Sequence, residues 1–438
     1  MSKFISRLRD SDAVNSMLRY NVVATAAPRR VTRDYAASSA QGKQSIRAGL
    51  LRDTINDARK TAYGAEFGDA IDDWPILSKD RLRTNAEDFC GSTILKIGAG
   101  TGGTTGQPIA LSRSIASIAV ERFFIEQLVL PHGLSLKSSR VAVLRADEIK
   151  SPQDTSPPFG IHRLGGRHLI LSNPHLNRDT VGWYVDAIQR HGTEILYVYP
   201  SMLENLMELA NANSLSLEVP LVLSSSETVA PALFDEVRST LGATLVDYYG
   251  LGERVALASV GPDRQYYFNP LYGQVELTDM QETADDGNAL YRIIATGYWN
   301  PAMPLIRYDT GDIAIVRRSD ESRIEEIQIG ERGFVGILGR TSEFIVGPDG
   351  SRISGLNHLP RGVSDLVRMQ VYQPSPDTVE IRLRPGPGFT QQSMRQLRDN
   401  VEAMIPPTIK VDIRDDAEFT KAANGKTPFV IREMTCAE

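Results

Sequence analysis

Short apolar stretches alternate with helical stretches through the middle of the chain, and this alternation limits the fold more than any other feature. Strand-like segments occur at residues 141–144, 195–198, 221–223 and 244–247. Helical patterns separate them at residues 180–191, 202–212 and 231–241. Strands that are joined by helices pack into a parallel sheet with helices over its faces. We therefore expect an α/β fold built from βα units.

The length of the chain and two changes of pattern predict its domains. A chain of 438 residues is longer than one core usually supports, which is roughly 250–300 residues. From about residue 271 strand-like segments follow one another without helices, which predicts a β subdomain over residues 271–340. After Arg340 a helical pattern at 391–404 lies between short strands. We expect a large N-terminal domain over 1–340 and a small α+β C-terminal domain over 341–438.

The charge and the cysteines exclude several classes of partner. The formal net charge is −6, which does not favour nucleic acid or anionic membranes. No apolar run approaches the length of a bilayer span, and charges interrupt the N-terminus too early for a signal peptide. Two cysteines, Cys90 and Cys436, do not form a disulfide scaffold or a zinc motif. We expect a cytoplasmic protein without nucleic-acid or membrane partners.

A glycine-rich segment at residues 98–106 is the most informative motif. It contains five glycines and three threonines and follows a strand-like stretch at 94–97. Glycine lets successive backbone N–H groups turn toward an anion, and threonine hydroxyls add donors. The pattern indicates a phosphate-binding loop, with a flexible surface loop as the alternative.

Two named nucleotide motifs fail in this segment. A Walker A loop needs a lysine where Thr104 stands. The dinucleotide fingerprint matches at Gly98, Gly100 and Gly103, but it also needs an acidic residue at the end of a second strand. Glu121 has nearly the right spacing and lies in a helical pattern instead. The context therefore argues against a dehydrogenase.

Further short motifs precede and follow the glycine-rich segment in a fixed order. They are Pro75-Ile76-Leu77-Ser78-Lys79-Asp80, Tyr199-Pro200-Ser201, Ser225-Ser226-Glu227, Tyr248-Tyr249-Gly250-Leu251-Gly252-Glu253, Pro304-Leu305-Ile306-Arg307-Tyr308-Asp309-Thr310-Gly311-Asp312, Gly339-Arg340 and Asn424-Gly425-Lys426. With Thr101–Pro108, this series resembles the adenylate-forming superfamily, and most of all the branch of phenylacetate–CoA ligase and the CapK-like proteins. Because the match runs in order over most of the chain, it is more specific than any single motif.

The resemblance implies a role for each matched residue. Glu253 would hold Mg²⁺, and Lys426 would be the catalytic lysine. Tyr249 would stack on adenine, and Asp312 would accept hydrogen bonds from the ribose. The residues implied to bind ATP or AMP are Thr101, Gly102, Gly103, Thr104, Thr105, Gly106, Ser226, Glu227, Tyr248, Tyr249, Gly250, Asp312 and Arg340.

Taken singly, these residues have simpler explanations. Tyr249 could be a core aromatic residue, Glu253 a surface carboxylate and Asp312 a turn residue. Lys426 could lie at a solvated hairpin tip. All these explanations would have to hold together, which the order of the motifs argues against.

The resemblance implies an ATP-dependent ligase that releases AMP and pyrophosphate, with ATP and Mg²⁺ as cofactors. The acid would become an acyl-adenylate, and the mobile C-terminal domain would then rotate to admit CoA as acceptor. An amine or a carrier-protein thiol is an alternative acceptor. Adenylyl transfer to a hydroxyl and a degenerate nucleotide-binding module are further alternatives.

The substrate pocket and the assembly lack a distinctive sequence motif. Tyr199, Ser201 and Phe124 are candidates for the pocket of a small carboxylic acid, and core packing explains these segments equally well. The oligomeric state cannot be read from the sequence, and a homodimer is the assembly that the resemblance suggests.

Overall fold

The computed structural model describes most of the chain. It covers residues 12–93, 95–100, 109–145, 149–150, 154–172, 175–227, 229–284, 287–338, 345–348, 352–353, 356, 359–360, 363, 366–385, 388–415, 418–420 and 429–433.

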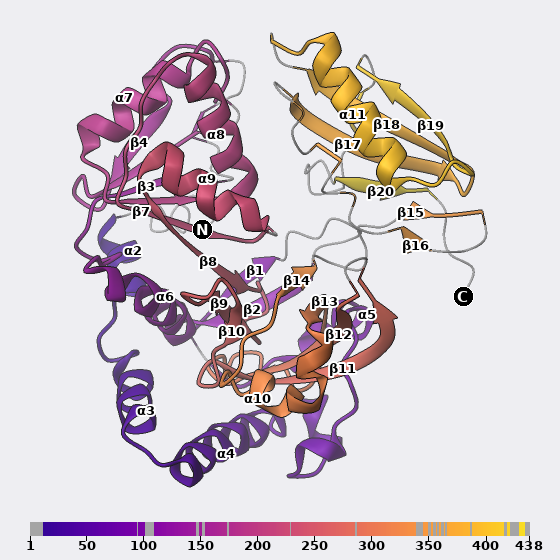
Figure 1. Cartoon of the computed structure of the whole chain (residues 1–438). Coiled ribbons are helices and arrows are strands. Elements are labelled where there is room, and N and C mark those ends of the chain that lie inside the picture. The colour runs from indigo at the N-terminus through magenta and orange to yellow at the C-terminus, as the bar shows by residue number, and fades with distance from the viewer. Residues whose placement is uncertain are drawn as a thin grey trace.

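An eight-stranded sheet has the strand order β10-β9-β8-β7-β6-β3-β5-β4 (Figure 1). The inner strands β8, β7, β6, β3 and β5 are parallel, and β9, β10 and β4 are antiparallel additions at the two edges. The predicted parallel α/β sheet is confirmed. The strands are β3 (Val141–Leu144), β4 (Gly160–Arg163), β5 (His168–Leu171), β6 (Ile195–Val198), β7 (Leu221–Ser225), β8 (Thr244–Gly250), β9 (Leu257–Val260) and β10 (Tyr266–Phe268).

Three helices cover one face of this sheet: α7 (Val181–His191), α8 (Pro200–Ala212) and α9 (Pro231–Leu241). Proline is the first residue of α8 and of α9, where its missing N–H costs no helical hydrogen bond. Gly192 and Gly242 end α7 and α9 in the left-handed conformation. These signals explain why the predicted bounds of the helices lie close to the observed ones.

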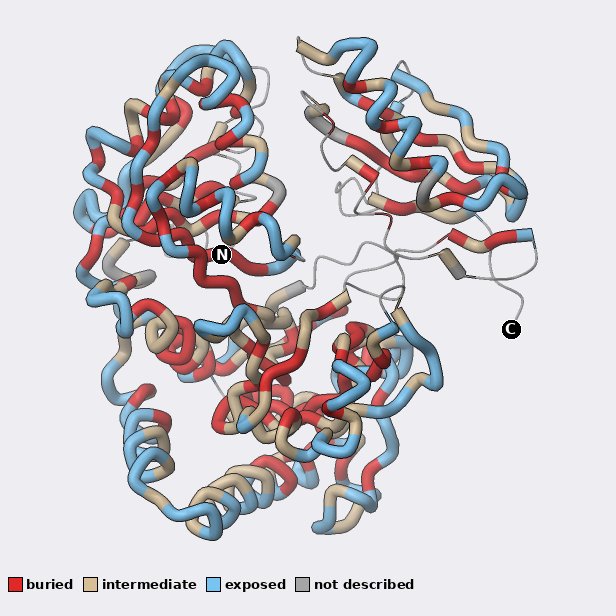
Figure 2. Tube along the Cα trace, in the orientation of Figure 1, coloured by how far each residue is buried: buried red, intermediate tan, exposed pale blue. Residues whose placement is uncertain are grey.

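Helix α6 (Ile115–Val129) packs against the opposite face of the sheet. Successive side chains of a strand point to opposite faces, so each inner strand contributes to two cores. Ala142 and Leu144 of β3 pack with α7–α9, whereas Val141 packs with α6. Figure 2 shows buried residues concentrated along the sheet strands and the helix sides that face them.

The N-terminal part is mainly helical. It contains α2 (Asp12–Arg19), α3 (Ala26–Ala36), α4 (Ala40–Ala58) and α5 (Lys79–Thr84), with 3-10 turns at Gly64–Glu66, Ile71–Asp73 and Ala86–Phe89. Pro28 lies in the first turn of α3, where proline is tolerated, and arginine favours helices. Ser39 caps α4 by accepting a hydrogen bond from the Gly42 N–H.

A four-stranded antiparallel sheet follows, in the order β11-β12-β13-β14, and confirms the expected change to antiparallel β structure. Its elements are β11 (Gly273–Thr283), β12 (Ala289–Gly297), β13 (Tyr308–Val316) and β14 (Gly336–Leu338), with a 3-10 turn at Arg318–Arg323 and α10 (Ile324–Gln328) between β13 and β14.

The glycine-rich segment begins in a hairpin. Strand β1 (Lys96–Gly100) pairs antiparallel with β2 (Ala110–Ser114), which leads through a Ser114 cap into α6. Gly98 and Gly100 are therefore strand residues, and the predicted loop is shorter at its start than expected. Because β1 belongs to a two-stranded hairpin and not to the parallel sheet, the βα turn that a dinucleotide fold requires is not formed at Gly98 and Gly100.

The C-terminal part has its own sheet, in the order β19-β18-β17-β20, and its own hydrophobic core. Its elements are β15 (Ile345–Val346), β16 (Arg352–Ile353), β17 (Leu366–Ser375), β18 (Thr378–Pro385), α11 (Gln391–Met404), β19 (Lys410–Arg414) and β20 (Val430–Arg432). The predicted α+β pattern is confirmed, whereas the predicted boundary after Arg340 lies outside the described residues.

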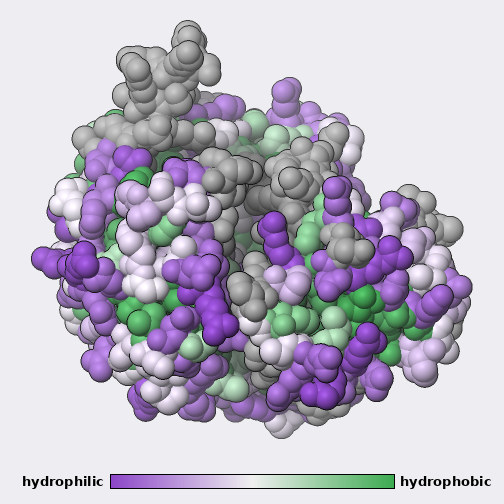
Figure 3. Space-filling view, turned by 90° about the horizontal axis from the view of Figure 1, so that it is seen from above, coloured by the Kyte–Doolittle hydropathy of each residue, from purple (hydrophilic) through white to green (hydrophobic). Residues whose placement is uncertain are grey.

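The surface seen in Figure 3 is largely hydrophilic, with hydrophobic side chains in small groups between polar ones. Within the described part of the chain, each helix is too short or too polar to cross a membrane.

Candidate active site

The ends of the parallel strands provide the frame of the site. Strand β8 runs in parallel with β7 and ends in Tyr248, Tyr249 and Gly250. Ligands of open α/β sheets bind at the carboxyl ends of the strands. The motif residues of β7 and β8 therefore lie at the edge where such a fold holds its ligand.

Glu253 follows in the turn after β8 and is 4% exposed. The Tyr308 hydroxyl donates a hydrogen bond to Oε1 of Glu253 over 2.7 Å. Oε2 is buried and has no hydrogen-bond partner among the described residues. A buried carboxylate oxygen without a partner is rare, because desolvation without a hydrogen bond is costly.

This free oxygen fits a Mg²⁺ ligand. Mg²⁺ prefers oxygen ligands and is often held by one or two carboxylates together with substrate phosphates and waters. Across the described ranges, no group of three or more His, Cys, Asp or Glu side chains could hold a metal ion.

The Glu253 turn lies directly against the antiparallel sheet. A side chain at Gly297 would meet the Arg254 carbonyl oxygen at 2.3 Å, and one at Gly273 would meet the Val255 carbonyl oxygen at 2.1 Å. Glycine at these two positions therefore allows the ends of β11 and β12 to approach the turn. No local sequence pattern predicts this contact.

Asp312 and Tyr249 form a second pair. The Tyr249 hydroxyl donates to Oδ2 of Asp312 over 2.7 Å, and Asp312 is 5% exposed. Burial, and then the neighbouring Asp312 carboxylate, raise the pKa of Tyr249 well above its ordinary value, so the hydroxyl stays a donor. The two residues come from β8 and β13, and the structure brings these two predicted nucleotide ligands together.

The arginine of the Pro304–Asp312 motif has a structural position. Arg307 forms an ion pair with Glu276 of β11, with 2.8 Å between Nη2 and Oε2. Its Nη1 donates to the Trp74 carbonyl oxygen over 2.9 Å. Leu77 forms two backbone hydrogen bonds of 2.9 Å beside it, with the Arg307 carbonyl and the Asp309 N–H. The motif at residues 75–80 therefore packs against the start of β13, next to Tyr308.

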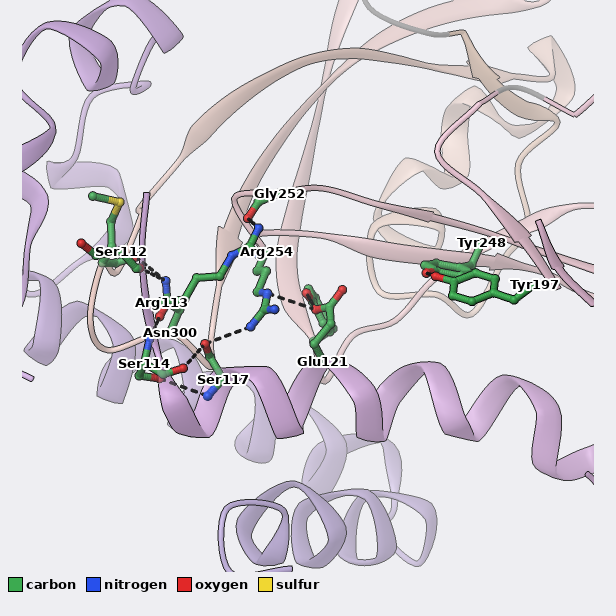
Figure 4. Close-up of polar contacts among 12 residues, drawn as sticks. Ser112, Arg113, Ser114, Ser117, Glu121, Tyr197, Tyr248, Gly252, Arg254 and Asn300 are labelled. Carbon is green, nitrogen blue, oxygen red and sulfur yellow. Dashed lines mark hydrogen bonds and ion pairs between the residues drawn. The ribbon is translucent and has the colours of Figure 1, made fainter. Parts of the chain in front are cut away.

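Two further arginines that were not predicted hold the Glu253 turn (Figure 4). Arg113 of β2 donates to the Gly252 carbonyl oxygen over 2.6 Å. Arg254 donates to Oγ of Ser117 over 3.0 Å and lies 3.8 Å from the carboxylate of Glu121. Burial, and then Arg254, lower the pKa of Arg113. The strand after the glycine-rich segment, the start of α6 and the Glu253 turn are thus tied together.

Ser226 and Glu227 follow β7 at the same edge of the sheet. Ser226 has a φ of 75°, in the left-handed region that serine rarely adopts, which is typical of functional turns. Its hydroxyl accepts a hydrogen bond of 2.9 Å from Nη2 of Arg145. Tyr248 and Gly250 belong to β8 beside them.

The predicted pocket residues have different environments. Tyr199 directly precedes α8, and its ring faces Arg145, with 4.4 Å between the ring centroid and the guanidinium carbon. Ser201 lies in α8, and its side chain is outside the described set. Phe124 is 2% exposed and packs among Phe123, Tyr272 and Trp299, which favours the core-packing alternative.

Other predicted site residues lie outside the described ranges. They are Thr101, Gly102, Gly103, Thr104, Thr105, Gly106, Arg340 and Lys426. Their assigned roles remain predictions.

Comparisons with known proteins agree on one group of enzymes. Residues 101–279 match the family model described as AMP-binding enzyme. Protein CapK of Staphylococcus aureus is 20% identical over 320 residues, which cover 72% of this chain and 69% of CapK.

Two solved structures share the fold. Both are of 2-hydroxyisobutyryl-CoA ligase in the postadenylation state, one in complex with R3-HIB-AMP and one with 2-HIB-AMP. They are 15% and 14% identical, have TM-scores of 0.58 and 0.59, and in each case 90% of both chains is covered. The AMP-binding match over residues 101–279, the CapK relative and this shared fold support the adenylate-forming superfamily.

Proposed function

We propose that this protein uses ATP to convert a carboxylic acid into an acyl-adenylate and then transfers the acyl group to the thiol of CoA. The observation that carries the proposal is the buried Glu253 carboxylate with its unpartnered Oε2. The Tyr249–Asp312 pair at the carboxyl edge of the sheet supports a nucleotide beside it.

In the first step, an oxygen of the acid's carboxylate attacks the α-phosphorus of ATP. A bond forms between these two atoms, the bond from the α-phosphorus to the bridging oxygen breaks, and pyrophosphate leaves. Asp312 would accept hydrogen bonds from the ribose hydroxyls, and Tyr249 would cover the adenine. Glu253 would hold Mg²⁺, which when bound supplies neutralisation of the phosphate charge.

Residues outside the described ranges would complete the site. Thr101–Gly106 would hold the leaving phosphates through backbone N–H groups and hydroxyls. Arg340 would lie with the nucleotide, and Lys426 would stabilise charge that develops at the α-phosphate. Each preorganised donor of this kind typically contributes about 10²–10³ in rate.

CoA is the proposed acceptor because two structures that share this fold at TM-scores above 0.5 are of a CoA ligase. In the second step the thiol sulfur attacks the acyl carbonyl, a thioester forms and AMP leaves. An amine, a carrier-protein thiol or a hydroxyl that takes AMP itself would give a product of different mass.

The test measures pyrophosphate release with ATP, Mg²⁺ and a panel of aromatic and aliphatic acids, with and without CoA. We expect release that depends on one class of acid and rises when CoA is added, with a thioester in the mass spectrum. Acid-dependent release without a thioester would replace CoA by another acceptor. If no acid stimulates pyrophosphate release, but a hydroxyl compound does and carries AMP in the product, an adenylyltransferase would replace the ligase.

A further inference from the structure

Arg145 directly follows β3 and shares one face of the sheet with three tyrosines. Side chains two residues apart on a strand point to the same face. Val143 pairs in register with Tyr197 of β6, so Arg145 and Tyr199, two residues further on, project on that face as well. The register also places Tyr248 there, beside Ser225 and two positions after Val246. This face is the one that α6 covers nearer the middle of the sheet.

The Arg145 guanidinium lies between two aromatic rings. Its carbon is 4.4 Å from the ring centroid of Tyr197 and 4.4 Å from that of Tyr199. One of its N–H groups donates to Ser226, so the side chain reaches from the end of β3 across β6 to the turn after β7. The hydroxyls of Tyr197 and Tyr248 contact each other, and the two rings lie together in Figure 4.

This arginine lacks a carboxylate partner among the described residues. Arg254 lies beside Glu121 and Arg307 beside Glu276, whereas Arg113 donates to a backbone carbonyl oxygen. Among the described residues, Arg145 contacts the rings of Tyr197 and Tyr199 and forms hydrogen bonds with the neutral hydroxyls of Tyr199 and Ser226. A guanidinium has five N–H donors in a fork that matches carboxylate or phosphate. The half-buried cation therefore has donors and charge to offer a ligand.

We propose that Arg145 binds a second anionic group on the acid substrate, so that the substrate is a dicarboxylic acid or an acid with another anionic group. This inference rests on the proposed function. Tyr248 contacts Tyr197, whose ring packs against Arg145, whereas its neighbour Tyr249 contacts Asp312. An acid lying along the end of β8 would place one anionic group on Arg145 and present its other carboxylate to the nucleotide.

The experiment compares acids that differ only in the second group, namely isophthalate with its monoamide and glutarate with its monoamide. Binding is measured by calorimetry, and acid-dependent pyrophosphate release is measured with ATP and Mg²⁺. The full-length variants are Arg145→Gln, Arg145→Lys and the control Arg163→Gln, which removes an exposed charge from β4 of the same sheet. A melting curve for each variant checks that it is folded.

We expect at least one dianionic acid to exceed its monoamide by about 10- to 100-fold in affinity and in kcat/KM, as for charge-assisted bidentate hydrogen bonds. Arg145→Gln should abolish this preference, Arg145→Lys should keep part of it, and Arg163→Gln should leave it unchanged.

Other outcomes separate the two proposals. If pyrophosphate release prefers the monoanionic acids, the second-anion site is overturned while the ligase function stands. The same conclusion follows if Arg145→Gln lowers pyrophosphate release equally for both members of each pair. Arg145-dependent binding of a dianion without pyrophosphate release supports the site and overturns the ligase function. Folded protein that binds neither member of either pair overturns the proposed site for dicarboxylates.

Discussion

Two buried carboxylates near the end of β8 differ in how their oxygens are satisfied. Asp247 is 2% exposed, and its two oxygens accept hydrogen bonds from Ser224 and Tyr266. Glu253 is buried to a similar degree but uses one oxygen, which accepts from Tyr308. Because a buried acceptor without a partner costs free energy, Glu253 points to a ligand and Asp247 to a structural role.

Replacing Glu253 by glutamine tests this distinction. Glu253→Gln keeps the size and the hydrogen bond from Tyr308 but removes the negative charge. We expect acid-dependent pyrophosphate release to fall by about 10²-fold or more and the Mg²⁺ concentration for half-maximal rate to rise.

The rate should be measured over a Mg²⁺ titration, with Glu282→Gln, an exposed change on β11, as control. An unchanged Mg²⁺ requirement in Glu253→Gln would remove Glu253 from the metal site.

The pKa of Asp247 gives a pH prediction. Burial raises it to about 7, against hydrogen bonds from Ser224 and Tyr266 that lower it. The folded state therefore keeps a proton that the unfolded chain loses near pH 4, so the free energy of unfolding decreases as pH rises from about 4 to 7. The contribution is on the order of 1 kcal/mol per pH unit.

The asparagine side chain of Asp247→Asn does not titrate. The free energy of unfolding of this variant, relative to that of the wild type, should therefore increase from about pH 4 to pH 7. Urea unfolding at pH 5, 6 and 7 measures the difference between the two proteins. His168 has the opposite effect, because burial lowers its pKa to about 4, but it is common to both proteins and cancels. Parallel stability profiles would show that Asp247 does not titrate as described.

At the scale of elements, the helices and strands that local sequence patterns determine could be predicted. The βα units were predictable because proline and glycine mark their ends and strands are continuously apolar. Strands β4 and β5 were missed, since His168 and the exposed end of β4 interrupt the apolar pattern. In the site, residues inside motifs were predicted, whereas Arg113, Arg145 and Arg254 act through tertiary contacts that no local pattern encodes.

Arg307 provides a prediction at this scale, because it joins three segments. It contacts Glu276 on β11 and the Trp74 carbonyl oxygen, and its backbone pairs with Leu77. Arg307→Ala should lower the free energy of unfolding by about 2 kcal/mol, since it leaves a half-buried carboxylate and a carbonyl without their donor.

Urea unfolding measures this change, and Arg264→Ala is the control. Arg264 pairs with Asp235, but both side chains are largely exposed, so its removal should have a much smaller effect. Equal effects of the two substitutions would mean that Arg307 does not hold the segments together.

At the scale of the whole molecule, the proposed mechanism requires two separately packed parts to cooperate. The candidate residues Glu253, Tyr249 and Asp312 lie in the large part, whereas the C-terminal sheet and α11 enclose a core of their own. A part with its own core can change position without losing its fold. The proposed lysine belongs to this second part, so the two half-reactions need not depend on it equally.

Lys426→Ala tests that separation. If Lys426 acts on the α-phosphate, pyrophosphate release should fall by about 10²–10³-fold. Transfer of the acyl group from a chemically prepared acyl-adenylate to CoA contains no attack at phosphorus, so its rate should change by less than about threefold. Rapid-quench measurement of each half-reaction gives the two rates, and Lys421→Ala, a nearby lysine in the sequence, should leave both intact. An equal loss in both half-reactions would point to a general defect of the C-terminal part, and undiminished pyrophosphate release would exclude Lys426 as the catalytic lysine.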